Sequence, residues 1–215
     1  MAITAKICGV NAPDAVAAVI AGGASHMGLN FYPPSPRYVS FGLAAALAAH
    51  MPGEVCKVGV FVDADDDTLG AVLDAVDIDL LQLHGDESVE RVEAVRATFG
   101  LPVMKAIRVA GPADIHTAGA FAEVADWLLF DARAPADMKG ALPGGNALSF
   151  DWQLIAGRRW PVPWMLSGGL EIGNVAEAVS VSGARNVDVS SGMEDCRGHK
   201  SPALIEAFLA HVAEL

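Results

Sequence analysis

Two side chains that can exchange protons stand at the ends of short apolar runs. Cys8 ends the run AKIC, and Asp131 follows directly on WLLF. A cysteine in such a run is more often a small core residue than a base, whereas a buried acidic residue needs a partner or a function. Together they offer an acid and base pair. Other polar or small residues that follow apolar runs are Arg37, His84, Gly168, Gly169, Asp188, Ser190, Ser191 and Gly192.

Two glycine-containing segments in the last third of the chain predict an anion site. LSGGLEIGNVAEAV places Gly168 and Gly169 between a strand and a helix, and SSGMEDCRG begins with Ser190 and Ser191 after the next strand. Small residues leave backbone amides accessible, and the N-terminus of a helix attracts anions. We therefore expect a phosphorylated small molecule to bind between these two segments.

Other chemistries have less support in the sequence. The six histidines show neither HExxH nor any paired spacing, so no metal site is expected. Lys105 lies in the apolar run PVMKAI and leaves open a Schiff base or a central acid. Cys56 is expected to be a core residue.

These residues can act together only if a fold brings the ends of their strands to one face. Short β-rich runs alternate with longer Ala-rich amphipathic runs, which is typical of βαβ units. An open dinucleotide-binding sheet fits less well, because the first turn reads CGVNAP rather than GxGxxG. We predict an α/β fold, one (β/α)₈ TIM-barrel domain over residues 1–215, with its site at the carboxyl ends of the strands. The eight strands are expected near residues 5–8, 25–31, 55–62, 78–83, 102–107, 127–131, 162–167 and 185–190.

Helix start signals support this alternation, with a plausible helix after each strand. Ser40 precedes FGLAAALAAH and Asp86 precedes ESVERVEAVRATF, and either side chain can cap a first turn. Pro112 and Pro202 fit first helical positions, where a missing N–H costs nothing. In the last helix five apolar residues share one face, Leu204, Ile205, Phe208, Leu209 and Val212.

Composition limits the class of protein. Fourteen Lys and Arg against 26 Asp and Glu give a net charge of -12, which argues against nucleic acid and anionic membranes as partners. The start MAITAKICGVNAPD has no apolar signal region, and no run of 18 apolar residues occurs. Three scattered cysteines do not suggest disulfides. We expect a cytoplasmic enzyme, as a monomer or homodimer.

The motifs resemble those of the phosphoribosylanthranilate isomerase family across nearly the whole chain. The matching segments are KICG at 6–9, FYPPSPRYVS at 31–40, VGVFVD at 58–63, LQLHGDE at 81–87, LLFDA at 128–132, GG and FDW at 144–152, LSGGL at 166–170 and VDVSSGMED at 187–195. The resemblance implies an Amadori rearrangement of N-(5-phosphoribosyl)anthranilate without a metal or cofactor. It also implies that Cys8 is the general base, that Asp131 is the general acid, and that Arg37 contacts the anthranilate carboxylate.

Such chemistry sets conditions on the two proton carriers. Cys8 has to be partly deprotonated, which a nearby positive charge or helix end would favour. Asp131 has to start protonated, which implies a desolvated position with anionic neighbours. Because the substrate itself is anionic, local positive charge must outweigh the distant negative charge of the protein.

Two departures from the family pattern and two rival functions stay open. The glycine-rich GGTG stretch reads Gly144-Gly145-Asn146-Ala147, and the end of the eighth loop, GKKD-like in the family, reads GHKS at 198–201. One rival is an indole-glycerol-phosphate-synthase-like lyase with Lys105 as its acid. The other is a barrel that binds a phosphorylated ligand without turning it over.

Overall fold

A computed structural model describes residues 2–215 and shows a closed barrel of eight parallel strands in sequence order. β1 pairs with β2 on one side and with β8 on the other, so the first and last barrel strands close the sheet. This confirms the predicted architecture. The strands are β1 (Thr4–Cys8), β2 (His26–Asn30), β3 (Cys56–Phe61), β4 (Leu80–Leu83), β5 (Val103–Val109), β6 (Trp127–Ala132), β7 (Trp164–Leu166) and β8 (Asn186–Val189).

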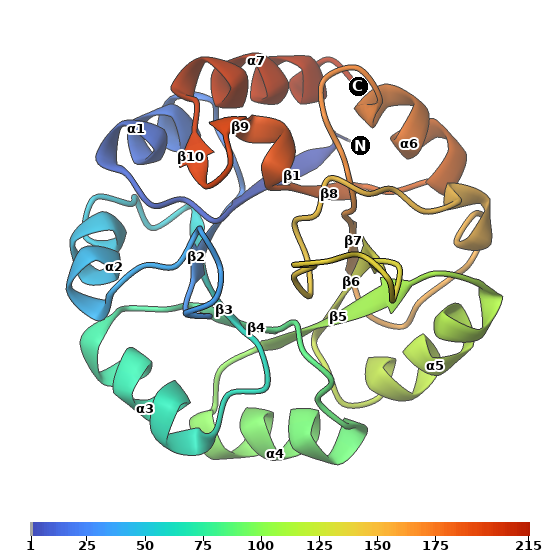
Figure 1. The fold of residues 1–215 in the computed structure, drawn as a ribbon, viewed down its shortest axis with the longest axis horizontal. Helices are drawn as coiled ribbons and strands as arrows, with labels where there is room; N and C mark the ends of the chain where they lie inside the picture. The colour runs from blue at the N-terminus through green and yellow to red at the C-terminus, as the bar shows by residue number, and fades with distance from the viewer. Residues whose placement is uncertain (1) are drawn as a thin grey trace.

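Within the described residues, the α-helices, seven in all, form a ring outside the barrel, as Figure 1 shows in a view along its axis. Their apolar faces and the outward side chains of the strands make the larger core, while a smaller cluster fills the barrel itself. The helices are α1 (Pro13–Ala21), α2 (Phe41–Ala48), α3 (Asp66–Ala75), α4 (Val89–Phe99), α5 (Pro112–Ala122), α6 (Val175–Ser182) and α7 (Pro202–Ala213). None of the helices within residues 2–215 has the length and apolarity to cross a membrane.

Most predicted helix starts are confirmed. The Ser40 side chain accepts a hydrogen bond from the Leu43 amide, and Pro112 and Pro202 begin their helices. The face of α7 is buried as expected, with Leu204 at its edge. Asp86 was the wrong cap: α4 begins two residues later than that position required, because Ser88 accepts from the Arg91 amide.

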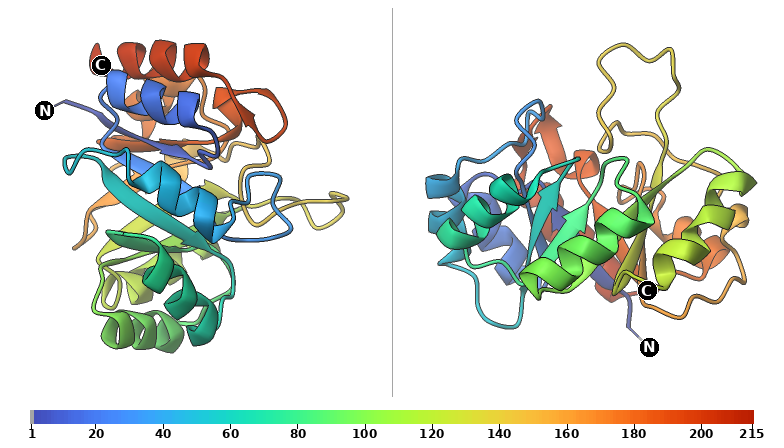
Figure 2. Two further views of the ribbon diagram at one scale, coloured as in Figure 1. Left: turned by 90° about the vertical axis from the view of Figure 1, so that its left-hand side faces the viewer. Right: turned by 90° about the horizontal axis from the view of Figure 1, so that it is seen from below.

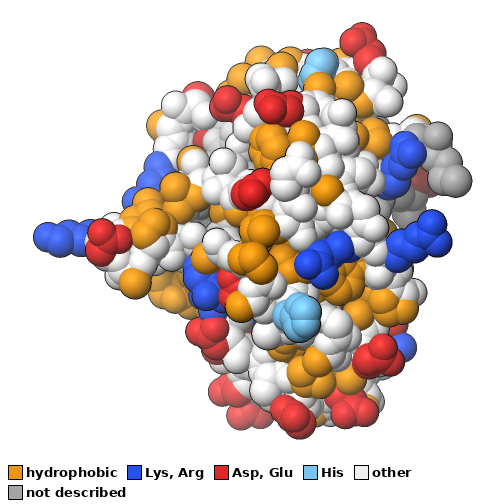
Figure 3. Space-filling view, turned by 90° about the vertical axis from the view of Figure 1, so that its right-hand side faces the viewer, with side chains coloured by type: hydrophobic (Ala, Val, Ile, Leu, Met, Phe, Trp, Pro, Cys, Tyr) orange, Lys and Arg blue, Asp and Glu red, His pale blue; other side chains and the backbone are white. Residues whose placement is uncertain are grey.

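The predicted helix after β6 is also wrong. The chain from Arg133 to Pro163 contains only a short 3₁₀ turn, η1 (Trp152–Leu154). Repeated proline and glycine in this stretch remove amide donors and favour turns, so no α-helix can propagate. Part of the segment projects from the barrel mouth in Figure 2, and the same projection appears at the left of Figure 3 with hydrophobic side chains and a charged tip.

A short antiparallel hairpin follows β8. After the 3₁₀ turn η2 (Ser191–Met193), β9 (Glu194–Cys196) and β10 (His199–Lys200) pair with each other rather than with the barrel. The hairpin leads straight into α7. It therefore places residues of the altered eighth loop beside the carboxyl ends of β1 and β8.

Candidate active site

A pocket lined by polar side chains and glycines opens at the carboxyl ends of the barrel strands. Nine predicted site residues lie in its wall. Gly192 is the exception, since it lines a neighbouring hollow shared with Gly169 and Ser191. The nine are Cys8, Arg37, His84, Asp131, Gly168, Gly169, Asp188, Ser190 and Ser191.

Alternation along the strands explains why these side chains meet. Successive side chains of a strand point to opposite faces, so residues two apart share a face. Cys8 belongs to the cluster inside the barrel, and Lys6 lies two residues before it on β1. Gln82 on β4 lies two residues before His84, which directly follows that strand. Sequence reasoning missed Lys6 and Gln82, although this spacing from a predicted site residue was a usable signal.

Cys8 lies beside a buried ion pair. Lys6 Nζ contacts Asp188 Oδ1 at 2.7 Å, and Asp188 Oδ2 accepts a hydrogen bond from Ser167 Oγ at 3.0 Å. Burial, with a smaller contribution from Asp188, holds the pKa of the Cys8 thiol above its ordinary value, and the positive charges of Lys6 and Lys200 offset part of this rise. Burial alone would lower the pKa of Lys6, but Asp188 and Cys8 raise it above its ordinary value, so Lys6 stays cationic. The charge that favours a thiolate therefore comes from lysines rather than from a helix end.

Asp131 is held by a chain of hydrogen bonds that begins at Gln82. Gln82 Nε2 lies 2.8 Å from His84 Nδ1, and His84 Nε2 lies 3.1 Å from Asp131 Oδ2. If the Gln82 amide donates to Nδ1, the imidazole carries its proton on Nε2 and donates it to Asp131. The Ala132 amide donates to the other carboxyl oxygen at 2.9 Å.

The anionic neighbours expected around Asp131 are replaced by these donors. Asp131 lies near the end of β6, where its carboxyl group is within reach of the His84 ring and of the Ala132 amide. The Asp131 carboxyl group is therefore fixed in orientation by contacts to both of its oxygens.

Arg37 shares one carboxylate with Lys200. Its Nε and Nη2 donate to the two oxygens of Glu194 at 2.5 and 3.0 Å, and Lys200 Nζ contacts Glu194 Oε1 at 2.7 Å. Although burial would raise it, these hydrogen bonds and the Lys200 charge lower the pKa of Glu194 to about 2. Two cations facing one anion leave a net positive charge. Sequence reasoning also missed Glu194 and Lys200, because only the hairpin fold brings them to Arg37.

Two glycines of the loop after β6 lie against the catalytic candidates. A Cβ at Gly144 would lie 2.6 Å from Asp131 Oδ2 and 2.6 Å from His84 Nε2. One at Gly145 would lie 2.4 Å from Arg37 Nη1, and the Gly145 carbonyl already accepts from Arg37 Nη2 at 3.2 Å. Any side chain at either position would displace one of these groups, so the loop can cover the pocket only with glycine.

The departure from the family's loop pattern has a structural counterpart. Asn146 closes the loop by accepting from the Leu142 amide at 2.9 Å and donating to the Leu142 carbonyl at 2.7 Å. Ala147 has a φ of 56°, in the left-handed region that costs a non-glycine residue about 1 kcal/mol. Asn146 thus fixes the loop that presents the two glycines, and Ala147 retains a conformation suited to glycine.

The loops after β7 and β8 adjoin each other at the pocket. Gly168 and Gly169 have φ angles of 92° and 61°, and a Cβ at either would meet the backbone within 2.9 Å. Ser190 donates to the Cys8 carbonyl at 3.1 Å, which ties the eighth loop to the first strand. This arrangement brings bare backbone to one corner of the pocket, as an anion site requires.

Lys105 does not enter this pocket, which removes the acid of the synthase-like rival. Its Nζ contacts Glu87 at 2.7 Å and the Gly85 carbonyl at 2.8 Å, and it lies over the ring of Phe121 on α5. Its neighbours Met104 and Ala106 fill the barrel interior, so alternation turns Lys105 outward.

The fold and the pocket define the class: a (β/α)₈ barrel with a polar pocket at the carboxyl ends of its strands, where the active sites of such barrels lie. A profile of the N-(5'phosphoribosyl)anthranilate (PRA) isomerase family matches residues 5–211. The chain belongs to this family. Its activity is that of the family, an aldose–ketose isomerisation in tryptophan biosynthesis.

Individual relatives agree with the family assignment. The chain is 58% identical over 215 residues to the N-(5'-phosphoribosyl)anthranilate isomerase of Rhodospirillum centenum, and the match covers all of both chains. The phosphoribosyl anthranilate isomerase of Thermotoga maritima superposes with a TM-score of 0.87 at 32% identity, covering 99% of this chain and 100% of the other. A phosphoribosyl anthranilate isomerase in complex with reduced 1-(o-carboxyphenylamino)-1-deoxyribulose 5-phosphate superposes with a TM-score of 0.83 at 30% identity, covering 99% and 100%.

Proposed function

We propose that Cys8 and Asp131 carry the two proton transfers of the isomerisation, as general base and general acid. The observation that supports these roles is that both side chains, from β1 and β6, line one pocket. Each also has its own polar support, Lys6 for Cys8 and His84 for Asp131. A core cysteine and a loop-anchoring aspartate would have no reason to share this wall.

The reaction follows from the two roles. Asp131 protonates the furanose ring oxygen as the anilino nitrogen expels it, and a cationic imine forms. This cation acidifies the second ribose carbon, from which the Cys8 thiolate removes a proton. The resulting enolamine tautomerises to the ketone, so no net proton is gained or lost.

His84 positions the carboxyl group of Asp131 for this transfer. Its Nε2 lies 3.1 Å from Asp131 Oδ2, and the Ala132 amide donates to the other oxygen, so the carboxyl group is held toward the pocket.

Substrate orientation follows from the charges of the wall. The phosphate binds at the corner formed by Gly168, Gly169, Ser190 and Ser191, and the anthranilate carboxylate binds near Arg37. Because Glu194 neutralises only one of Arg37 and Lys200, that side attracts an anion despite the protein's net charge of -12. A cytoplasmic location and a monomeric or homodimeric state stay predictions, the latter open to analytical ultracentrifugation.

Substitution of the two proton carriers tests the roles. General acids and bases typically contribute 10²–10⁴-fold, so Cys8→Ser and Asp131→Asn should each lower kcat by about that factor. The affinity for a reduced product analogue should change little. Cys56→Ser and Asp137→Asn are matched controls outside the pocket and should keep the parent kcat. A folded Cys8→Ser protein with close to the parent turnover would refute the role of Cys8.

A further inference from the structure

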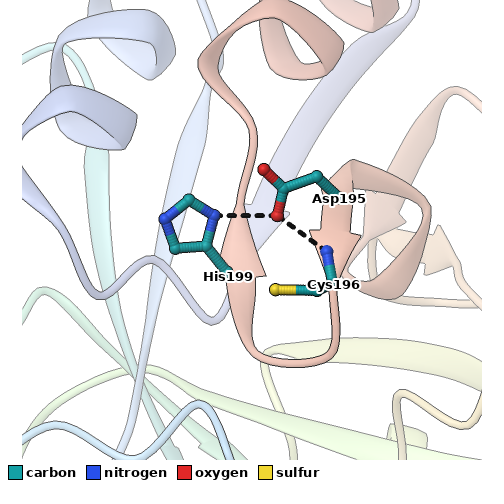
Figure 4. A group of neighbouring side chains, drawn as sticks. All are labelled: Asp195, Cys196 and His199. Carbon is teal, nitrogen blue, oxygen red and sulfur yellow. Dashed lines mark hydrogen bonds and ion pairs between the residues drawn. The ribbon is translucent and has the colours of Figure 1, made fainter.

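The outer face of the β9–β10 hairpin carries three side chains that the isomerisation does not use. Asp195, Cys196 and His199 converge on one point, as Figure 4 shows. A carboxylate oxygen, the thiol sulfur and a ring nitrogen all lie within 4.8 Å of one another. No other group of three such residues within residues 2–215 meets this condition.

We propose that Asp195, Cys196 and His199 form a binding site for a divalent transition metal, with Zn²⁺ as the expected ion. Thiolate and imidazole ligands favour Zn²⁺ over Mg²⁺ or Ca²⁺, which prefer oxygen alone. A tetrahedral ion bound at about 2.0–2.3 Å holds its ligand atoms roughly 3.3–3.6 Å apart. The three donors have to move by about 1 Å to reach this spacing.

The hairpin backbone is fixed in a way that presents these donors. His199 lies directly opposite Cys196 in the antiparallel pair. The turn between them is anchored by Asn11 Nδ2, which donates to the Gly198 carbonyl at 2.8 Å, and by the Gly198 amide, which donates to Glu194 at 3.0 Å. Only side-chain torsions need to change, so ordering the site costs little backbone entropy.

The three ligand groups are accessible to an ion from solvent, and the thiol can release its proton when the ion binds. The side chains of Asp195 and His199 are 55% and 59% exposed, and Cys196 is an exposed free thiol. Binding breaks the 2.8 Å hydrogen bond between His199 Nδ1 and Asp195, forms the sulfur–metal bond, and releases the thiol proton to solvent. Water completes the fourth position, as in other sites with three protein ligands.

An ion bound here would cross-link β9 and β10 near their turn, in the hairpin that also carries Glu194 against the pocket residue Arg37. Glu194, at the base of the hairpin, accepts hydrogen bonds from Arg37 and from Lys200 on the other face. Metal binding should therefore slow local opening of the hairpin, which is a consequence separate from turnover.

Binding is measured with Co²⁺ and Zn²⁺ on the purified full chain. Co²⁺ should give a thiolate charge-transfer band that saturates at one equivalent, and Zn²⁺ should displace it in competition with a chromophoric chelator. Cys196→Ser and His199→Gln should each weaken binding by at least about tenfold. Cys56→Ser and His50→Gln, a half-buried cysteine and an exposed histidine elsewhere, serve as matched controls and should bind like the parent.

Hydrogen exchange locates the ion independently. Zn²⁺ should slow exchange of the amides of residues 194–200 in the parent protein and leave them unchanged in Cys196→Ser. The proposal is overturned if no saturable binding occurs. It is equally overturned if affinity is unaltered in Cys196→Ser or in His199→Gln, because the three-ligand site requires both.

Discussion

The charge pair beside Cys8 gives a prediction about the thiolate that can be tested without substrate. A Cβ atom placed at Gly28 would lie 3.0 Å from Cys8 Sγ and 3.2 Å from Lys6 Nζ, so the sulfur and the nitrogen are within about 6 Å of each other. At that distance and an effective dielectric of about 20, a unit charge contributes about 3 kcal/mol, or roughly 100-fold in thiolate fraction at fixed pH. Lys6 favours the thiolate and Asp188 opposes it.

Two variants should therefore move the thiolate in opposite directions. Asp188→Asn removes the opposing charge and should increase the thiolate fraction of Cys8, by up to about 100-fold. The double variant Lys6→Met/Asp188→Asn removes the pair together, so that no unpaired buried charge remains. It should decrease the thiolate fraction, by about tenfold, because Lys6 outweighs Asp188 in its effect on the Cys8 pKa.

The assay is the pH dependence of iodoacetamide alkylation at Cys8 in the free protein, followed by mass spectrometry of its peptide. Cys56 and Cys196 in the same samples serve as internal references. The acidic limb of kcat/KM should shift with the alkylation profile if Cys8 is the base. If the alkylation profile shifted in the same direction in both variants, or in neither, the electrostatic account would be refuted. The Lys6–Asp188 pair would then have a structural role.

Three further perturbations test the anion contacts and the hairpin. Arg37→Ala should raise KM by about 10- to 150-fold, from a loss of about 1.5–3 kcal/mol for a charge-assisted contact, with a smaller change in kcat; an unchanged KM would remove Arg37 from the site. Gly169→Ala places a Cβ 2.9 Å from Leu148, so the inhibition constant for inorganic phosphate should rise by at least about tenfold, whereas Gly183→Ala, also at positive φ but in open space, should leave it unaltered. Because the pKa of Glu194 is lowered to about 2, its stabilising contribution is present above its ordinary pKa of 4.5 and is lost as the pH falls from there toward 2. Urea unfolding at pH 7 and pH 3 should show a smaller drop in stability for Glu194→Gln than for the parent, and an equal drop would contradict this assignment.

The sequence determined the barrel and the chemistry at its mouth. Apolar runs such as KVGVFV and WLLF can be buried on both sides only in a covered parallel sheet, and their number and order left a closed barrel as the best fit. The polar residue after each run then had to lie at the mouth. Cys8, His84 and Asp131 were found in this way, and the structure places all three in one pocket.

Local sequence signals gave wrong predictions where they had to choose between two capping residues or between the two faces of a strand. The cap of α4 is Ser88 rather than Asp86, and both were plausible from composition. Lys105 was considered as an inward acid, although alternation from Met104 turns it outward. The stretch after β6 lacks a helix because its prolines and glycines outweigh its alanines.

Only the tertiary structure decided which charges neighbour which. Lys6 and Asp188 are 182 residues apart, and Arg37 and Glu194 are 157 apart, so their contacts exist only because β8 closes against β1 and the hairpin folds back over that seam. The ionisation of Cys8 and the positive charge left at Arg37 depend on these contacts. Electrostatic interaction at a few ångströms is set by distance and burial, and neither is encoded in the local run of residues around a single side chain.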